Sequence, residues 1–143
     1  MKVLYLMRHA KSSWETPHLS DRQRPLLDKG VVRAEEQAKE LKESGAKLDS
    51  IWTSDAVRAT QTAEIVRKVL DLDEEAVFVE PAIYDARHVN DLLRVVRSIP
   101  DDFETVLLVG HNPVVTEFAR LFTRTRLDEM KTAQIIDIRF NDA

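Results

Sequence analysis

The chain has 143 residues, the usual size of one domain, and 43% of them are hydrophobic while 32% are charged. This balance excludes an intrinsically disordered chain and predicts a single folded domain over residues 1–143. The net charge of −4 gives no overall attraction to nucleic acid or to an anionic membrane, so neither is an expected partner. Without cysteine, the chain has neither disulfides nor thiolate chemistry.

The apolar runs of the chain are short. None reaches the roughly 20 residues that a membrane-spanning helix needs. The amino-terminal run, residues 3–7, reaches Arg8 too soon to act as a signal peptide. A cytoplasmic protein is therefore expected.

The first predicted elements are a strand, a long loop and a helix. Residues 3–7 form a continuous apolar run that is typical of a strand buried on both faces. The polar stretch 8–29 follows, and a loop of this length in a compact domain is usually functional. Apolar residues at helical spacing then predict a helix over 29–44, with Asp28 as its N-cap and Gly45 at its end.

The middle of the chain continues this alternation. Short apolar runs at 51–53 and 77–79 predict two further strands. Apolar residues at helical spacing predict one helix over 59–70, between these strands, and another over 89–99.

The clearest unit joins a strand at 105–109 to a helix through the turn Gly110-His111. Asn112 is predicted as the N-cap of this helix, and Pro113 as its first residue. The start of a helix also supplies backbone N–H groups and the positive end of a dipole, which favour an anion.

The fold expected from this order is an α/β domain, a three-layer α/β/α sandwich with a mostly parallel central sheet. A last strand is predicted over 133–140. In such sheets, ligands bind beyond the carboxyl ends of the strands. Arg8-His9, Ser54 to Arg58 and Gly110-His111 each follow a predicted strand, so we expect them to lie together.

Two histidines and two arginines at one edge of a sheet indicate a phosphate pocket. The planar guanidinium of arginine binds phosphate oxygens in pairs. At neutral pH histidine keeps an unprotonated nitrogen, which can act as a nucleophile or as an acid or base. Because the chain has only three glycines, a glycine-rich phosphate loop or dinucleotide site is not expected.

These residues resemble the motifs of the histidine phosphatase superfamily, which has the phosphoglycerate mutase-like fold. Leu6–Ala10 is similar to its "RHG" motif, with Ala10 in place of the usual glycine. Ser54–Ala63 and Val109–Pro113 are similar to its second and third motifs. The run Arg24-Pro25-Leu26 resembles the SixA-type phosphohistidine phosphatase branch.

The resemblance implies roles for four residues. His9 is the expected nucleophile, which becomes transiently phosphorylated. Arg8, Arg58 and His111 match the residues of the family that hold the phosphoryl group. The residue types agree with these roles, because each role needs the chemistry of the side chain found there.

Three further residues are expected near the substrate. Arg24 either closes the pocket or braces the loop, Ser54 caps a helix or contacts the ligand, and Asn112 starts the helix beside His111. A phosphate or sulfate anion is expected to fit this pocket. No metal ion or other cofactor is expected, because the histidines and scattered carboxylates lack metal-site spacing and the arginines repel a cation.

The substrate class depends on the proton donor. Larger members of the family have a catalytic glutamate after the third strand, and Asp85 is its nearest match here. A phosphohistidine can leave as neutral imidazole, whereas an alcohol benefits from a general acid. The sequence therefore favours a phosphatase for phosphohistidine in a phosphorylated protein. Two alternatives stay open: a phosphomonoesterase for a small phosphorylated metabolite with Asp85 as general acid, and a phosphohistidine-binding module without turnover.

Overall fold

The central strands are apolar on both faces, and for this reason helices cover the sheet on both sides. The computed structural model describes residues 1–140. In β1 (Val3–Arg8), Leu6 packs into one hydrophobic core and Met7 into the other. The residues of β4 (Thr105–Gly110) alternate between the same two cores.

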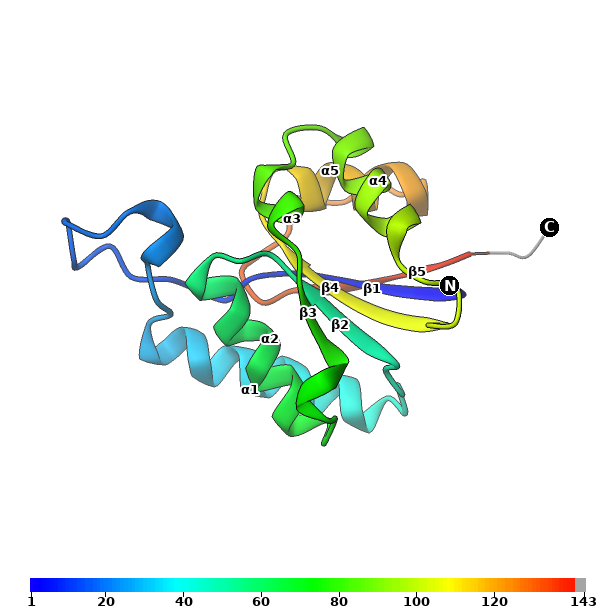
Figure 1. The fold of residues 1–143 in the computed structure, drawn as a ribbon, viewed down its shortest axis with the longest axis horizontal. Helices are drawn as coiled ribbons and strands as arrows, with labels where there is room; N and C mark the ends of the chain where they lie inside the picture. Colours follow the sequence, from blue (N-terminus) through cyan, green and yellow to red (C-terminus); the bar gives the residue numbers. More distant parts are fainter. Residues whose placement is uncertain (141–143) are drawn as a thin grey trace.

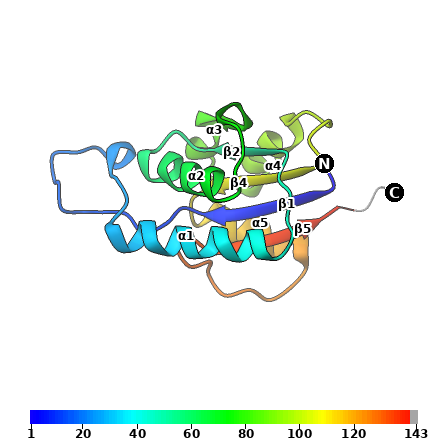
Figure 2. The ribbon, with the colours of Figure 1, turned by 90° about the horizontal axis from the view of Figure 1, so that it is seen from below.

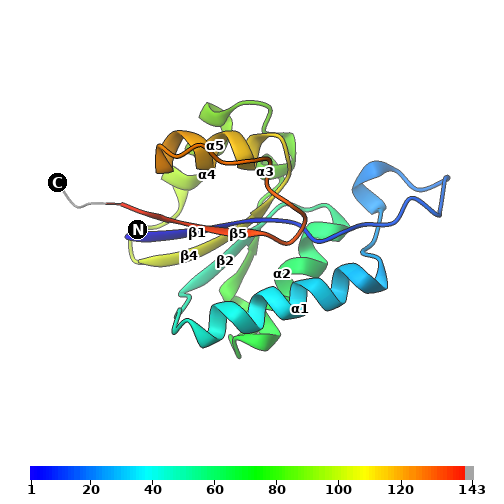
Figure 3. The same ribbon diagram turned by 180° about the vertical axis from the view of Figure 1, so that it is seen from behind.

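The sheet has five strands in the order β3-β2-β4-β1-β5. Four of them run parallel, and β5 runs antiparallel to β1 along one edge (Figure 3). Besides β1 and β4, the sheet contains β2 (Ser50–Thr53), β3 (Val77–Val79) and β5 (Ile135–Arg139). The prediction of an α/β fold with a mostly parallel sheet is confirmed.

Two helical layers enclose the sheet (Figures 1 and 2). One layer consists of α1 (Asp28–Glu43) and α2 (Val57–Val69). The other consists of α3 (Pro81–Asp85), α4 (Val89–Ser98) and α5 (Val114–Thr123). Two short 3₁₀ helices complete the fold, η1 (Asp21–Gln23) and η2 (Glu74–Ala76). Within residues 1–140, no helix is both long and apolar enough to cross a membrane.

Two predicted helix starts are wrong by one residue. Leu27, not Asp28, is the N-cap of α1. Pro113, not Asn112, is the N-cap of α5. The side chain of Asn112 does not cap the helix, because its Oδ1 accepts a hydrogen bond from Oγ1 of Thr116 at 2.6 Å and its Nδ2 donates to the carbonyl of Met130 at 3.0 Å.

The long loop between β1 and α1 projects from the carboxyl end of the sheet (Figure 1). Its two ends are held together, since the carbonyl of Lys11 accepts a hydrogen bond from the amide of Leu27 at 2.9 Å. Gly30 passes so close to this carbonyl that a Cβ at residue 30 would lie 2.3 Å from the oxygen of Lys11. The absence of a side chain at Gly30 therefore lets α1 pack against the segment that follows His9.

Candidate active site

Three strand ends bring the predicted residues to one place. His9 follows β1, His111 follows the neighbouring β4, and Arg58 lies in the first turn of α2 after β2. Arg8 is opposite Gly110 in the parallel register, and the amide of His9 donates to the carbonyl of Gly110 at 3.1 Å. The ring centroids of the two histidines lie 5.1 Å apart. The expected juxtaposition is confirmed, while the catalytic roles stay a prediction.

One ring nitrogen of His9 is unprotonated. Its Nδ1 lies 2.7 Å from the carbonyl oxygen of Ala10, and because a carbonyl only accepts, Nδ1 carries the proton. Nε2 therefore has a lone pair, and Nε of Arg58 points a hydrogen at it from 3.4 Å. Burial and the charges of Arg58 and Arg8 lower the pKa of His9 to about 4, against the opposing effect of the bond to Ala10. His9 is thus a neutral imidazole at pH 7.

His111 is also neutral at pH 7. Burial, and then the neighbouring His9 and Arg58, lower the pKa of His111 to about 3. Its Nε2 lies 2.7 Å from Oγ of Ser54, whereas its Nδ1 is buried and has no hydrogen-bond partner within residues 1–140. The two histidines therefore add no positive charge of their own to the site.

The guanidinium of Arg58 is buried and held by the loop. Its Nη1 donates to the carbonyl of Asp21 at 2.6 Å, and its Nη2 donates to the Oδ2 carboxylate oxygen of Asp21 at 2.9 Å. The side chain of Arg58 is only 7% exposed. Because a buried charge needs a partner, Asp21 both neutralises Arg58 and directs its Nε towards His9.

Asp21 has further partners beside Arg58. Arg24 donates from Nη2 to Oδ1 of Asp21 at 3.0 Å, and the hydroxyl of Tyr84 donates to Oδ2 at 2.7 Å. Burial raises the pKa of Asp21, but the hydrogen bonds from Tyr84 and Arg58 outweigh it and hold that pKa well below its usual range. The carboxylate of Asp21 is therefore ionised at neutral pH.

Arg8 is oriented by the segment that follows α5. Its Nη1 donates to the carbonyl of Met130 at 2.8 Å. Met130 is fully buried, and its amide donates to Oγ1 of Thr116 at 2.9 Å. In the part of the chain that the structure describes, Nε of Arg8 is buried and has no partner. The N–H at Nε of Arg8 is therefore available to a ligand.

A cleft of about 410 Å³ lies over these groups, and its lining includes Arg8, His9, Arg24, Arg58 and His111. Asp21 lines the same cleft. Three arginines and Lys11 face this one carboxylate, so the lining of the cleft has an excess of positive charge, which suits a phosphate dianion.

The predicted substrate-binding residues lie at this cleft or beside it. Arg24 both lines the cleft and braces the loop, since its Nη1 donates to Oγ of Ser12 at 2.9 Å and its guanidinium lies 3.4 Å from the ring centroid of Trp14. Asn112 lines the cleft, but its amide is bound to Thr116 and Met130. The prediction that Ser54 caps a helix is wrong, because the N-cap of α2 is Ala56. Ser54 is fully buried, and its Oγ lies 2.7 Å from Nε2 of His111.

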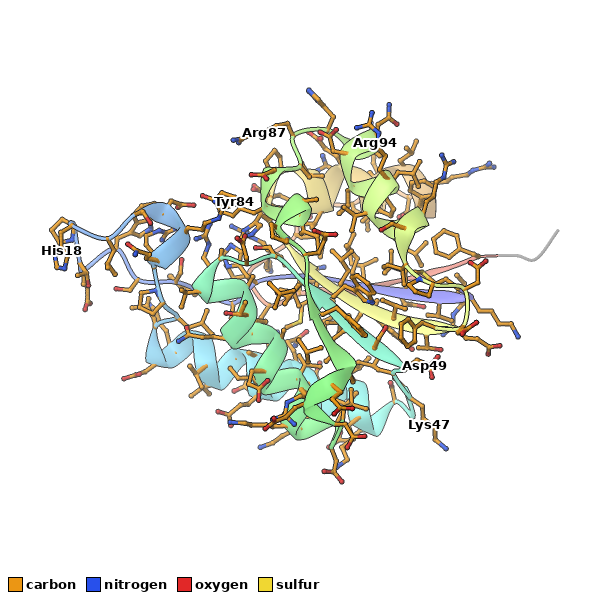
Figure 4. All side chains as sticks on the ribbon, viewed as in Figure 1. His18, Lys47, Asp49, Tyr84, Arg87 and Arg94 are labelled. Atoms are coloured by element: carbon orange, nitrogen blue, oxygen red, sulfur yellow. The ribbon has the colours of Figure 1, made fainter. Side chains whose placement is uncertain are left out.

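Asp85 does not lie in the cleft. Its carboxylate is 71% exposed and pairs with Nη2 of Arg22 at 3.5 Å, and it lines a separate groove with Glu80 and Asp91. Asp85 is the last residue of α3, and successive residues of a helix point in different directions. Tyr84, the preceding residue, faces the loop instead (Figure 4) and bonds to Asp21. The geometry gives no support to Asp85 as general acid.

Three positioning groups were missed from the sequence. Thr62 accepts a hydrogen bond from the amide of Ala10 at 3.0 Å and donates to the carbonyl of Arg58 at 2.7 Å. Its place one helical turn after Arg58 is a signal that would have identified it. Met130 acts through its backbone carbonyl, which every residue type has, so the sequence does not identify it. Asp21 begins the 3₁₀ helix η1, whose three residues are too few to give a periodic pattern in the sequence.

Among residues 1–140, there is no group of three or more histidine, cysteine, aspartate or glutamate side chains that could hold a metal ion. The charged groups over His9 are mainly arginines, which suit an anion.

The chain matches a known protein family and a known protein in sequence. A model of the histidine phosphatase superfamily (branch 1) matches residues 4–83, which include Arg8, His9 and Arg58. An uncharacterized chloroplastic protein of Arabidopsis thaliana is 32% identical over 129 residues, which are 84% of this chain. The match spans only 58% of the length of that relative.

Two solved structures share the fold. A candidate phosphohistidine phosphatase SixA from Agrobacterium tumefaciens has a TM-score of 0.76 and 28% sequence identity, over 85% of this chain and 76% of that chain. The protein histidine phosphatase SixA complexed with tungstate has a TM-score of 0.82 and 23% identity, over 94% of this chain and 86% of that chain.

The two buried histidines predict how stability depends on pH. Their pKa values of about 4 and 3 lie below the unfolded value of 6.5, so between these limits the unfolded chain binds protons that the native protein does not. The free energy of unfolding should therefore fall by about 2–4 kcal/mol when the pH is lowered from 7 to 5. Urea unfolding at a series of pH values measures this.

The control for this experiment is an exposed histidine. His111→Asn should remove about half of the dependence between pH 7 and 5, whereas His18→Asn, at the outer tip of the loop (Figure 4), should keep it. The ionised Asp21 does not alter the change in the free energy of unfolding between pH 7 and 5. Its contribution to stability is lost only below the pKa of an aspartate in the unfolded chain, near 4. Equal slopes in all three proteins would contradict neutral, buried histidines.

Removal of the Asp21 charge should destabilise the protein. Asp21→Asn keeps the shape but leaves buried Arg58 and Arg24 without an anion, so we expect a loss of about 1–3 kcal/mol in the free energy of unfolding. Asp55→Asn is the matched control, because Asp55 pairs with the exposed Arg22, and it should cost less than about 1 kcal/mol. Inorganic phosphate should restore part of the loss in the Asp21 variant, and equal losses in both variants would contradict this account.

Proposed function

The chain belongs to the histidine phosphatase superfamily, and we propose that it hydrolyses phosphohistidine in a phosphorylated protein through a covalent intermediate on Nε2 of His9. The observation that carries this proposal is the neutral imidazole of His9. Its Nδ1–H is held by the carbonyl of Ala10, and its Nε2 lone pair faces the arginines that would bind a phosphoryl group.

In the first step, the lone pair of Nε2 attacks phosphorus. The bond between phosphorus and the leaving nitrogen breaks, and its electron pair goes to the leaving imidazole. Arg8 and Arg58 bind the phosphoryl oxygens, with His111 as a further donor, and stabilise the charge of the transition state. Asp21 anchors Arg58 and Met130 anchors Arg8. The hydrogen bond from Nε of Arg58 to Nε2 of His9 is replaced by one to a phosphoryl oxygen, which frees the lone pair for the attack.

In the second step, water attacks the phosphorus of phospho-His9. The bond from phosphorus to Nε2 breaks, its electron pair returns to Nε2, and the proton of water is taken up by the released phosphate. His9 is then again the neutral tautomer with its proton on Nδ1, held by Ala10. Neither step requires a protein group to change its tautomer.

The acidic residues of the site favour phosphohistidine over an alkyl ester. Asp21 is the carboxylate in the cleft, and it is ionised because Tyr84 and Arg58 bond to it. Asp85 pairs with Arg22 outside the cleft. An alcohol would thus leave without a ready carboxylic acid, whereas imidazole can carry its own proton. Similarity to the SixA structures supports the same substrate class.

The test compares three substrates. The protein should hydrolyse a phosphohistidine peptide and p-nitrophenyl phosphate, and an alkyl phosphate should react about 100-fold more slowly because its leaving oxygen needs a proton. His9→Ala should lower turnover of all three at least about 1000-fold, since the nucleophile is gone. Asp85→Asn is the control and should behave like the wild type on every substrate.

Two results would overturn the proposal. Fast hydrolysis of an alkyl phosphate that is lost in Asp85→Asn would identify a phosphomonoesterase with Asp85 as its acid. Tight binding of the phosphohistidine peptide without release of phosphate would identify a binding module.

A further inference from the structure

The hydroxyl of Ser54 has two polar contacts in a fully buried position at the end of β2. Its Oγ accepts a hydrogen bond from the amide of Ala56 at 3.1 Å. The same oxygen lies 2.7 Å from Nε2 of His111. Since the amide can only donate, the single proton of Ser54 is available for His111.

The direction of the bond between Ser54 and His111 follows from hydrogen-bond accounting. If Ser54 donates, Nε2 of His111 accepts, and every polar atom of Ser54 is used. If His111 donated instead, the proton of Ser54 would have no acceptor among the contacts that the described structure gives it. That direction leaves two buried groups unsatisfied, the hydroxyl proton of Ser54 and the Nδ1 lone pair of His111, whereas the first leaves only the N–H at Nδ1. The first direction is therefore favoured.

A neutral His111 whose Nε2 accepts must carry its proton on Nδ1. That nitrogen is buried and has no partner within residues 1–140. Nε of Arg8 is the other buried side-chain nitrogen in this condition, and both residues line the cleft over His9. Two unpartnered N–H donors at one cleft are explained by an anionic ligand that accepts from both.

We propose that Ser54 is a positioning residue that fixes His111 as the Nδ1–H tautomer, so that this N–H donates to a phosphoryl oxygen. The opposite tautomer would turn a lone pair towards the oxygens and repel them. The catalytic half of this inference depends on the proposed function, but the assignment of the tautomer does not.

The tautomer can be observed directly by NMR. With only four histidines, a ¹⁵N-histidine sample gives few signals, and those absent from a His111→Asn sample belong to His111. At pH 7, we expect Nδ1 of His111 to have the shift of a protonated nitrogen and Nε2 that of an unprotonated one. In Ser54→Ala, the signals should move towards the opposite tautomer. A protonated Nε2 in the wild type, or no change in Ser54→Ala, would overturn the assignment.

Turnover tests the consequence for the reaction. Ser54→Ala should lower kcat/KM by about 10- to 100-fold, less than the loss of about 100- to 1000-fold expected when a transition-state donor is removed outright. Ser54→Thr keeps the hydroxyl and should restore both the tautomer and most of the activity. If Ser54→Thr does not fold, the spectra of the wild type and Ser54→Ala still decide the tautomer.

Ser50→Ala is the matched control, because Ser50 is also fully buried in β2 and its hydroxyl accepts a bond from Nε1 of Trp52 at 3.1 Å, away from the cleft. It should keep both the activity and the His111 signals. A shifted tautomer in Ser54→Ala with unchanged kcat/KM would contradict the donor role of His111. The predicted tautomer in a wild type without phosphatase activity would contradict the proposed function and leave the assignment standing.

Discussion

The pairing of buried Arg58 with Asp21 is the interaction on which the rest of the site depends. A guanidinium with a side chain 7% exposed must have an anion or carbonyl at hand, and Asp21 offers both its carboxylate and its backbone oxygen. The same contact ties the loop after β1 to α2. Arg24 donates to the other carboxylate oxygen, Oδ1, and Tyr84 donates to Oδ2, which also accepts from Arg58. The loop, the helix and the cleft therefore share one ionic centre.

This centre also sets the chemistry of His9. The charges of Arg58 and Arg8, added to burial, lower the pKa of His9 to about 4 and so keep its nitrogen unprotonated. The carbonyl of Ala10 then decides which nitrogen carries the proton. In the proposed arrangement, Ser54 likewise fixes the tautomer of His111. The results differ, because Nε2 of His9 keeps a lone pair whereas Nδ1 of His111 keeps a proton that it can donate.

Sequence patterns predict those parts of the site that follow strand ends. A continuous apolar run predicts a buried strand, and the geometry of parallel sheets then brings Arg8, His9 and His111 to one edge. Asp21 could not be placed in this way, because it lies in the three-residue helix η1 of the long loop, which is too short to show a period that fixes where a side chain points. Asp85 and Tyr84 illustrate the same limit: they are adjacent in α3, yet Tyr84 faces the site while Asp85 faces Arg22.

The most direct test of the account is the position of the phosphate on the reacted protein. The phosphoenzyme would be trapped by rapid denaturation at alkaline pH, where phosphohistidine survives, and the modified atom identified by mass spectrometry and ³¹P–¹⁵N NMR. Phosphorylation of His9 on Nε2 is expected, because Nδ1 is occupied by its bond to Ala10. Phosphate on Nδ1 of His9 or on another residue, or steady turnover without any phosphoenzyme under these conditions, would contradict it.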